Sequence, residues 1–247
     1  MMAVSISVAI MASLAPQPCV DGLSYVSVLP SGVALLLGDR NNAAAALDNG
    51  IPGFESCRVV CVTSGSDLRM LRRQAAKTGK EAMFEAVPMR DALHTGEVFD
   101  IAAGLADALD AVDRAVCAAA RRGPRGAANG RPAVLVHCTL GVNRSPTLVL
   151  AFLVRQGLAL RQAYRSVLRA RPGIDPLDGY REALRNYEVE LCGRGSTVAA
   201  SEAFAVHFSE LLRRSSGDFD GAWAMREQAV EALLSEADGE GEGEGVS

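Results

Sequence analysis

The chain has 247 residues, of which 49% are hydrophobic and 22% charged, and its formal net charge is −4 at pH 7. This composition excludes a chain that is disordered throughout, and the length suits one domain of ordinary size with extensions. The small negative charge provides no broad cationic field, so we expect neither nucleic acid nor a membrane as a partner. Any anion site must therefore be local.

The N-terminal residues 3–15 are apolar, but no Lys or Arg precedes Arg40. The basic start of a secretory signal is therefore missing, and the run is too short to span a bilayer. We expect an edge strand or an N-terminal arm here, with a cryptic targeting signal as the minority interpretation.

Six cysteines are scattered along the chain without the paired spacing of a metal site. Cys57 and Cys61 form one loose C-x-x-x-C in a run of β-branched residues, where core positions are the expected role. A chain of this length does not need disulfides to fold, so the thiols indicate a reducing compartment. We expect a cytoplasmic or nuclear protein with no metal and no other cofactor.

The first half of the chain alternates between strand and helix patterns. Residues 24–38 predict two short strands around a Pro-Ser-Gly turn, and residues 41–47 predict a short helix. The Val-rich run 58–63 is typical of a buried parallel strand. Apolar residues three or four positions apart predict a long amphipathic helix over 97–122, followed by a Gly/Pro/Arg loop at 123–132 that tolerates insertion.

A second buried strand is predicted at 133–138, followed by a polar turn and a helix that is apolar nearly all round. Two more helices fit 160–169 and 177–191, because the prolines between them end one and start the other. This order predicts an α/β fold, a single layered domain whose central, mainly parallel sheet is flanked by helices.

The chain changes character after Cys192. Residues 193–197 read as a linker, 200–214 and 221–235 as amphipathic helices, and the alternating Gly and Glu of 239–245 as a disordered tail. We therefore expect four parts: an arm (1–22), a main domain (23–192), a helical extension (193–235) and a disordered tail (236–247).

The loop from Cys138 to Arg144, which follows the predicted strand at 133–138, gives the strongest indication of a chemical function. Its N–H groups can form a cup for a phosphate dianion, and the helix that follows adds the positive end of its dipole. Ser145 is predicted to cap this helix and Pro146 to be its first residue.

Two side chains of the loop suit phosphate chemistry. Arg144 lies six positions after Cys138, so a curled loop brings a planar two-donor guanidinium to the phosphate oxygens. The same positive surroundings favour the thiolate of Cys138, which is the nucleophile that phosphoryl transfer to sulfur requires. Gly141 allows the close backbone approach that the cup demands.

A Cys-x5-Arg loop with His137 before it and Ser145 after it resembles the signature of the cysteine-based protein tyrosine phosphatase superfamily, and VHCTLGVNRSPT is most similar to the dual-specificity phosphatase branch. The resemblance covers roughly residues 24–192. It implies the phosphatase fold and a protein phosphatase that acts on phosphotyrosine and on phosphoserine or phosphothreonine through a phosphocysteine intermediate.

The resemblance also assigns roles to matching positions. Cys138 would attack phosphorus, Arg144 would bind the equatorial oxygens, and Ser145 would assist departure of the thiolate. Asp91 would protonate the leaving oxygen and later deprotonate water, with Glu97 and Asp100 as reserves. His137 would order the loop and not act as a base. The phosphate-binding positions would be Thr139, Leu140, Gly141, Val142, Asn143 and Arg144.

Two departures from the family pattern stand out. The interval between Asp91 and Cys138 is longer than usual, which the insertion at 123–132 explains without touching the site. Leu177 stands where many relatives have Asn, so stabilisation of the loop by that side chain is in doubt.

Other functions stay open from the sequence. Phosphoinositides and RNA 5′-triphosphates carry more negative charge than a singly phosphorylated side chain. The residues between Cys138 and Arg144 are all neutral and would not compensate that extra charge, which favours phosphorylated proteins as the partners. A non-catalytic protein that binds phosphoproteins is a further alternative. The helices of the extension could dock a partner, and Cys61 or Cys117 could serve as a resolving thiol.

Overall fold

The computed structural model describes residues 22–89, 101–121, 130–198 and 208–235. The chain divides into two compact units, 1–199 and 200–247. Apart from Gly22, the predicted arm lies outside the described residues, as does the whole predicted tail, so the domain boundaries stay a prediction.

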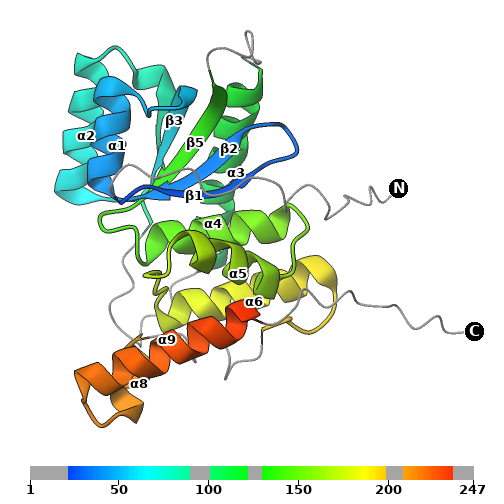
Figure 1. Cartoon of the computed structure of the whole chain (residues 1–247). Helices are drawn as coiled ribbons and strands as arrows, with labels where there is room; N and C mark the ends of the chain where they lie inside the picture. Colours follow the sequence, from blue (N-terminus) through cyan, green and yellow to red (C-terminus); the bar gives the residue numbers. More distant parts are fainter. Residues whose placement is uncertain (1–21, 90–100, 122–129, 199–207, 236–247) are drawn as a thin grey trace, which may run out of the picture. The chain divides into compact units, whose positions relative to one another are not determined.

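The first unit contains a five-stranded sheet in the order β1-β2-β5-β3-β4 (Figure 1). β1 is antiparallel to β2, and every other pair is parallel, which confirms the predicted α/β fold with a mainly parallel sheet. The strands are β1 (Ser24–Val28), β2 (Ala34–Gly38), β3 (Phe54–Cys61), β4 (Phe84–Ala86) and β5 (Arg131–His137).

Helices cover both faces of this sheet. They are α1 (Arg40–Asn49), α2 (Gly65–Lys77), the short 3-10 helix η2 (Glu81–Met83), α3 (Ile101–Ala120), α4 (Arg144–Arg155), α5 (Leu160–Ala170) and α6 (Asp178–Cys192). The second unit contains α8 (Phe208–Arg214) and α9 (Phe219–Ser235). None of the helices in the described part of the chain is long and apolar enough to cross a membrane.

The side chains of the central strands alternate between two cores. On one face, Leu36 of β2, Val59 of β3 and Leu135 of β5 belong to a buried cluster with α1 and α2. On the other face, α3 contacts β3 and β5, and α4 contacts β2 and β5 (Figure 1). Both faces are therefore covered, as the Val-rich and Leu-rich strand sequences require.

The carboxyl ends of the parallel strands meet at one edge of the sheet. β2 pairs Gly38 with His137 of β5, and β3 pairs Cys61 with the same histidine. Just beyond β3, the Val62 N–H donates to the His137 carbonyl at 3.1 Å. The loop that follows His137 therefore starts from the centre of this edge, where open α/β sheets bind their ligands.

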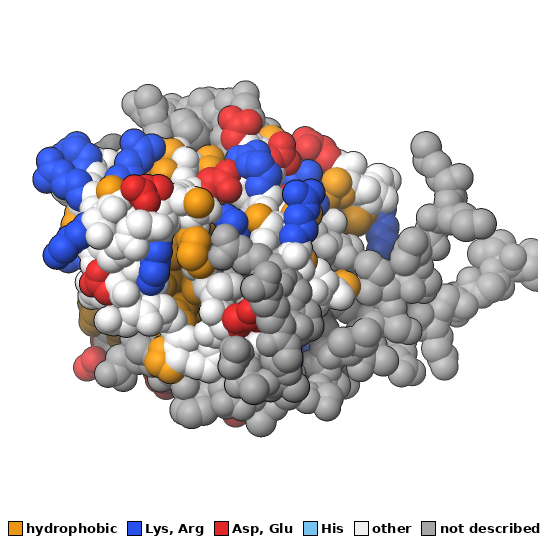
Figure 2. All heavy atoms as spheres, turned by 90° about the horizontal axis from the view of Figure 1, so that it is seen from above, with side chains coloured by type: hydrophobic (Ala, Val, Ile, Leu, Met, Phe, Trp, Pro, Cys, Tyr) orange, Lys and Arg blue, Asp and Glu red, His pale blue; other side chains and the backbone are white. Residues whose placement is uncertain are grey.

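Three described elements, α2, η2 and β4, were not expected from the sequence. α2 follows β3 directly, and the short β4 extends the sheet beyond β3. α2 buries only Leu68, Leu71 and Ala75, and its outer face is strongly basic. Lys and Arg side chains gather on the side of Figure 2 that corresponds to α1 and α2 in Figure 1.

A buried carboxylate joins α5 to α6. Glu188 of α6 is 1% exposed and accepts hydrogen bonds from the Leu160 N–H at 2.7 Å and the Ser196 hydroxyl at 2.6 Å. It also accepts from the Thr197 N–H at 2.8 Å and the Thr197 hydroxyl at 2.7 Å. Burial acts to raise the pKa of Glu188, but these donors outweigh it and hold the pKa below its ordinary value. The ionised carboxylate therefore stabilises the start of α5 and residues 196–197.

Replacing Glu188 should destabilise the fold in a pH-dependent way. Glu188→Ala leaves buried donors without partners, and we expect a loss of about 2–4 kcal/mol in the free energy of unfolding at pH 7, measured by urea titration. Glu188→Gln, which keeps the shape, should lose less. Because the folded-state pKa is depressed, the stabilisation by the charge is complete above the unfolded pKa of about 4.3 and disappears as pH falls through the folded pKa. A wild-type advantage over Glu188→Gln that grew on acidification would contradict this assignment.

Candidate active site

The loop between β5 and α4 closes around the sulfur of Cys138. The Gly141 N–H and the Ser145 hydroxyl each donate to Cys138 Sγ at 3.2 Å. Cys138 is 2% exposed, and Ser145 is completely buried. The sulfur thus lies inside the curve of the loop, with donors arriving from its middle and from its end.

These contacts determine the charge on the sulfur. Burial acts to raise the pKa of Cys138, whereas the hydrogen bonds from Ser145 and Gly141 and the positive charge of Arg144 act to lower it. The lowering prevails, so the pKa lies below the ordinary value of a cysteine thiol. The loop therefore favours the thiolate, the reactive form of cysteine.

The predicted helix cap at Ser145 is wrong. α4 begins at Arg144, with Asn143 as its N-cap residue, and the Thr147 N–H donates to the Asn143 carbonyl at 3.1 Å. The physical reason is that the Ser145 hydroxyl is directed to Cys138 Sγ. Pro146 lies inside the first turn, where its missing N–H costs no helical hydrogen bond.

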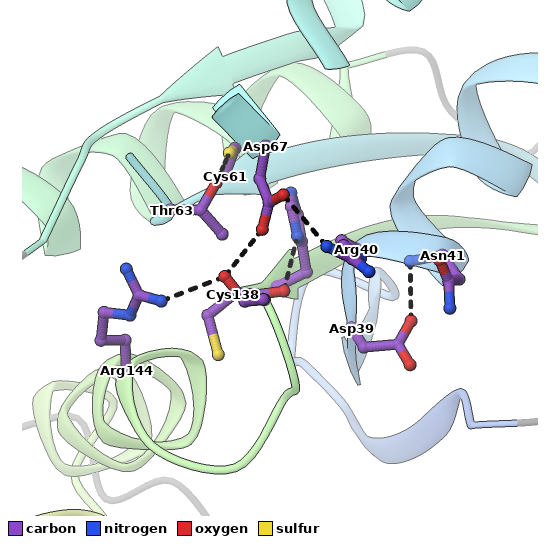
Figure 3. Close-up of polar contacts among 10 residues, drawn as sticks. Asp39, Arg40, Asn41, Cys61, Thr63, Asp67, Cys138 and Arg144 are labelled. Atoms are coloured by element: carbon purple, nitrogen blue, oxygen red, sulfur yellow. Dashed lines mark hydrogen bonds and ion pairs between the residues drawn. The ribbon is translucent and has the colours of Figure 1, made fainter. Parts of the chain in front are cut away.

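Arg144 is held by a chain of polar contacts across the loop. Its guanidinium donates to the Thr139 hydroxyl at 3.2 Å, and that hydroxyl donates to Asp67 of α2 at 2.9 Å. Asp67 also pairs with Arg40 of α1 at 3.2 Å. Figure 3 shows these contacts running from Arg144 through the loop to α2 and α1. Two helices outside the loop therefore help to orient the arginine.

Arg171, which sequence reasoning did not single out, ties the loop from behind. It follows α5 and donates to the Gly141 carbonyl at 2.8 Å and to the Leu140 carbonyl at 3.0 Å. A third contact reaches the Gly22 carbonyl at 2.5 Å. The Leu140 side chain itself is 69% exposed. Arg171 therefore positions the backbone of the loop and leaves its rim open to solvent.

Gly141 is required by both conformation and space. Its φ is +70°, and a Cβ built there would lie 2.7 Å from the Gly38 carbonyl oxygen and from the Arg171 guanidinium. A backbone carbonyl cannot move aside as a flexible side chain can. The tight turn that directs the Gly141 N–H to the sulfur therefore depends on glycine.

His137, the last residue of β5, is buried and comes directly before the loop. Its Nδ1 lies 3.2 Å from the Cys138 carbonyl oxygen, which can only accept, so Nδ1 carries the proton. Burial lowers the pKa of His137 to about 4, so the ring is neutral at pH 7. This geometry supports the loop-ordering role that the family resemblance implies.

The far end of the loop is held by the segment before α6. Asn143 Oδ1 accepts from the Leu177 N–H at 2.9 Å, and the Val142 carbonyl accepts from the Asp175 N–H at 2.7 Å. Leu177 therefore stabilises the loop through its backbone, although its side chain has no polar group. The departure from the family pattern at this position does not leave the loop unsupported.

The predicted acid and its reserves, Asp91, Glu97 and Asp100, lie outside the described residues. The segment leading to them is described: the Val87 N–H donates to the Cys61 carbonyl at 2.9 Å, and the Met89 N–H donates to the Val62 carbonyl at 3.1 Å. Among the residues that the structure describes, no group of three or more His, Cys, Asp or Glu could hold a metal ion.

Comparison with known families places the chain. The family model "Dual specificity phosphatase, catalytic domain" matches residues 65–190, about half of the chain. The chain therefore belongs to the dual-specificity phosphatases of the cysteine-based superfamily.

Two curated relatives carry the name of this family. Dual specificity protein phosphatase 14 of Mus musculus is 39% identical over 75 residues, 30% of this chain, and dual specificity protein phosphatase 5 of Rattus norvegicus is 28% identical over 165 residues, 63% of this chain. The matches span only 38% of the length of each relative. Among solved structures, human DUSP28 is 27% identical with a TM-score of 0.47, and the match covers 72% of this chain and 99% of that one.

The hydrogen bond from Ser145 should determine how easily Cys138 ionises. Removing it in Ser145→Ala should raise the thiol pKa, because one of the donors that stabilise the thiolate is lost. We expect the pH profile of Cys138 alkylation by iodoacetamide, followed by peptide mass spectrometry, to shift to higher pH. The exposed Cys117 and Cys192 serve as internal references. An identical profile in the variant would show that the Ser145 contact does not stabilise the thiolate.

Proposed function

We propose that the protein is a phosphatase that hydrolyses phosphotyrosine and phosphoserine or phosphothreonine in proteins through a phosphocysteine intermediate. The observation that carries the proposal is the buried Cys138 sulfur, which accepts hydrogen bonds from Gly141 and Ser145 within the family's signature loop. These donors stabilise the Cys138 thiolate, which can act as the nucleophile that attacks a phosphate ester.

The two chemical steps follow from the same contacts. In the first, the Cys138 thiolate forms the S–P bond while the bond from phosphorus to the leaving oxygen breaks, and Arg144 and the loop N–H groups bind the three remaining oxygens. In the second, water attacks phosphorus and the thiolate departs. The Ser145 hydroxyl, 3.2 Å from the sulfur, donates a hydrogen bond to the leaving thiolate.

Asp91 is proposed as the acid that protonates the leaving oxygen and as the base that then activates water. The support is the path of the preceding chain. The Met89 N–H donates a hydrogen bond to the Val62 carbonyl, and the Val62 N–H donates one to the carbonyl of His137 at the start of the loop. The described chain is therefore anchored beside the loop as far as Met89, and Asp91 follows two residues later in the sequence, which supports its choice as the proton donor.

The rival functions differ in the substrate or in turnover. A phosphoinositide or RNA 5′-triphosphate phosphatase would share the phosphocysteine chemistry, whereas a binding protein would capture phosphorylated partners without releasing phosphate. The neutral side chains between Cys138 and Arg144 favour a singly phosphorylated side chain over a substrate with several phosphates. We propose a cytoplasmic or nuclear location on the strength of the free thiols.

Replacing the nucleophile should separate catalysis from binding. Wild-type protein should release phosphate from an aryl phosphate and from phosphopeptides, and Cys138→Ser should lower kcat by at least about 1000-fold. Phosphate release would be followed by a colorimetric assay, with tight binding of phosphopeptide to Cys138→Ser as evidence of an intact loop. Equal inactivity of both forms, combined with phosphopeptide binding, would identify a binding protein. Preferred hydrolysis of phosphoinositides would identify the lipid alternative.

Replacing the acid should make turnover depend on the leaving group. Asp91→Ala should lower kcat by about 100-fold or more for phosphopeptides, whose alkoxide or phenoxide leaves poorly without a proton. Aryl phosphates with acidic leaving groups should be affected much less. Comparison of kcat across a series of substituted phenyl phosphates measures this dependence, with Asp91→Asn as the isosteric control. An unchanged rate with phosphopeptide would move the role to Glu97 or Asp100.

A further inference from the structure

A basic hollow lies along the outer face of α2, outside the phosphate loop. It has a volume of about 520 Å³ and is lined by Asp48, Ser66, Arg69, Met70, Arg73, Gln74 and Lys77. Six of these residues belong to α2 and recur every three or four positions, so they form a single stripe on the helix. We name this feature the α2 hollow.

The cations of the α2 hollow are not neutralised within the described structure. Arg69, Arg73 and Lys77 are exposed and make no ion pair with a described residue. Among the described residues that line the hollow, Asp48 is the only carboxylate, and it accepts a hydrogen bond from Gln74 at 2.5 Å. Like charges at positions i and i+4 repel one another on a helix, so this arrangement is unfavourable for the isolated protein. An anionic partner would relieve the repulsion.

The α2 hollow begins beside the phosphate loop. Ser66, at one end of the stripe, is adjacent in sequence to Asp67, whose carboxylate accepts from the Thr139 hydroxyl of the loop at 2.9 Å. From Asp67 the helix rises about 1.5 Å per residue, so Arg73 and Lys77 lie about 9 and 15 Å further along it. A row of cations therefore leads away from the site at which the phosphate would bind.

We propose that the α2 hollow binds an acidic stretch of the protein substrate, and so selects phosphorylated residues with Asp or Glu a few positions away. This inference rests on the proposed phosphatase function. The occupant follows from charge complementarity, because three cations face one carboxylate, and from the continuity of the hollow with the loop. The exposed Met70, between Arg69 and Arg73, adds an apolar contact for the substrate chain.

The geometry also sets where the acidic residues should lie. An extended peptide advances about 3.3 Å per residue, so the 9 to 15 Å along α2 correspond to roughly three to five residues. Arg69 lies only about 3 Å along the helix from Asp67, but Asp67 is itself separated from Arg144 by two hydrogen bonds of 3.2 and 2.9 Å through Thr139, so the acidic stretch should begin about three positions from the phosphorylated residue. Electrostatic contacts of this exposed kind weaken as salt screens them.

The test compares two phosphotyrosine peptides that are identical except for three Glu or three Gln, placed three to six positions from the phosphotyrosine on either side. For the wild-type chain we expect kcat/KM about tenfold higher for the Glu peptide at low ionic strength, with the preference declining in 0.5 M salt. In the variant R69E/R73E, and in the neutral R69Q/R73Q, the preference should disappear while kcat/KM for a small aryl phosphate stays unchanged.

A charge-matched control separates the α2 hollow from net charge. Arg121 and Arg194 are exposed and do not line the hollow, so R121E/R194E changes the net charge equally and should keep the preference for the Glu peptide. Peptide affinity of C138S chains, measured by fluorescence anisotropy with and without the α2 substitutions, should show the same difference without turnover. Circular dichroism of each variant verifies that α2 still folds.

The possible failures are distinguishable. Absence of aryl phosphate hydrolysis by the wild type would overturn the proposed function, whereas normal hydrolysis with equal kcat/KM for both peptides would overturn only this inference. Equal loss of the preference in R121E/R194E would assign it to the general field of the protein and overturn the inference as well. If a peptide of residues 236–247 bound the α2 hollow and the Glu phosphopeptide did not, the occupant would be the chain's own acidic tail, and the inference would again be wrong.

Discussion

The site depends on a buried sulfur that accepts two hydrogen bonds. Sulfur in a thiol is a weak acceptor, so Gly141 and Ser145 donors directed at Cys138 are most favourable when the sulfur carries charge. A charge in a nearly closed site is costly unless donors and a cation compensate it. The surrounding structure can be understood as the set of restraints that keep these donors and Arg144 in place.

Those restraints come from four different segments. Arg171 holds the middle of the loop by its carbonyls, and Leu177 holds Asn143 at its end. Asp67 orients Arg144 indirectly, through the Thr139 hydroxyl. His137, neutral and buried, donates to the first carbonyl of the loop. Since each restraint comes from a separate element, the loop keeps its shape only in the complete fold, and a short peptide with the same sequence would not adopt it.

Much of this arrangement could be predicted because its signals are local. The strand before Cys138, the apolar helix after it and the spacing to Arg144 are contiguous in sequence, and together they indicated both the α/β fold and the loop. The exposed, charged face of α2 hid a helix whose apolar positions Leu68, Leu71 and Ala75 could have indicated it. β4 has only three residues, too few for a periodic pattern.

The features that escaped prediction depend on contacts between distant residues. Arg171 looks like an ordinary helix-end cation in the sequence, and only the folded chain brings it to Gly141 and Gly22. The wrong helix cap has a similar origin, since Ser145 is a good capping residue whose hydroxyl is instead bound to Cys138. A sequence pattern shows only the local preference of serine for helix caps. Which of two possible partners the Ser145 hydroxyl binds is decided by the tertiary structure.

The contrast between Leu140 and its neighbour Gly141 has an evolutionary consequence. The Leu140 carbonyl is fixed by Arg171 while its side chain projects into solvent, and Gly141 has no room for any side chain at all. The conformation of the backbone that would hold the phosphate therefore does not depend on which side chain stands at position 140. Position 140 can therefore accept different side chains during evolution and so change which substrates bind, whereas position 141 can accept only glycine.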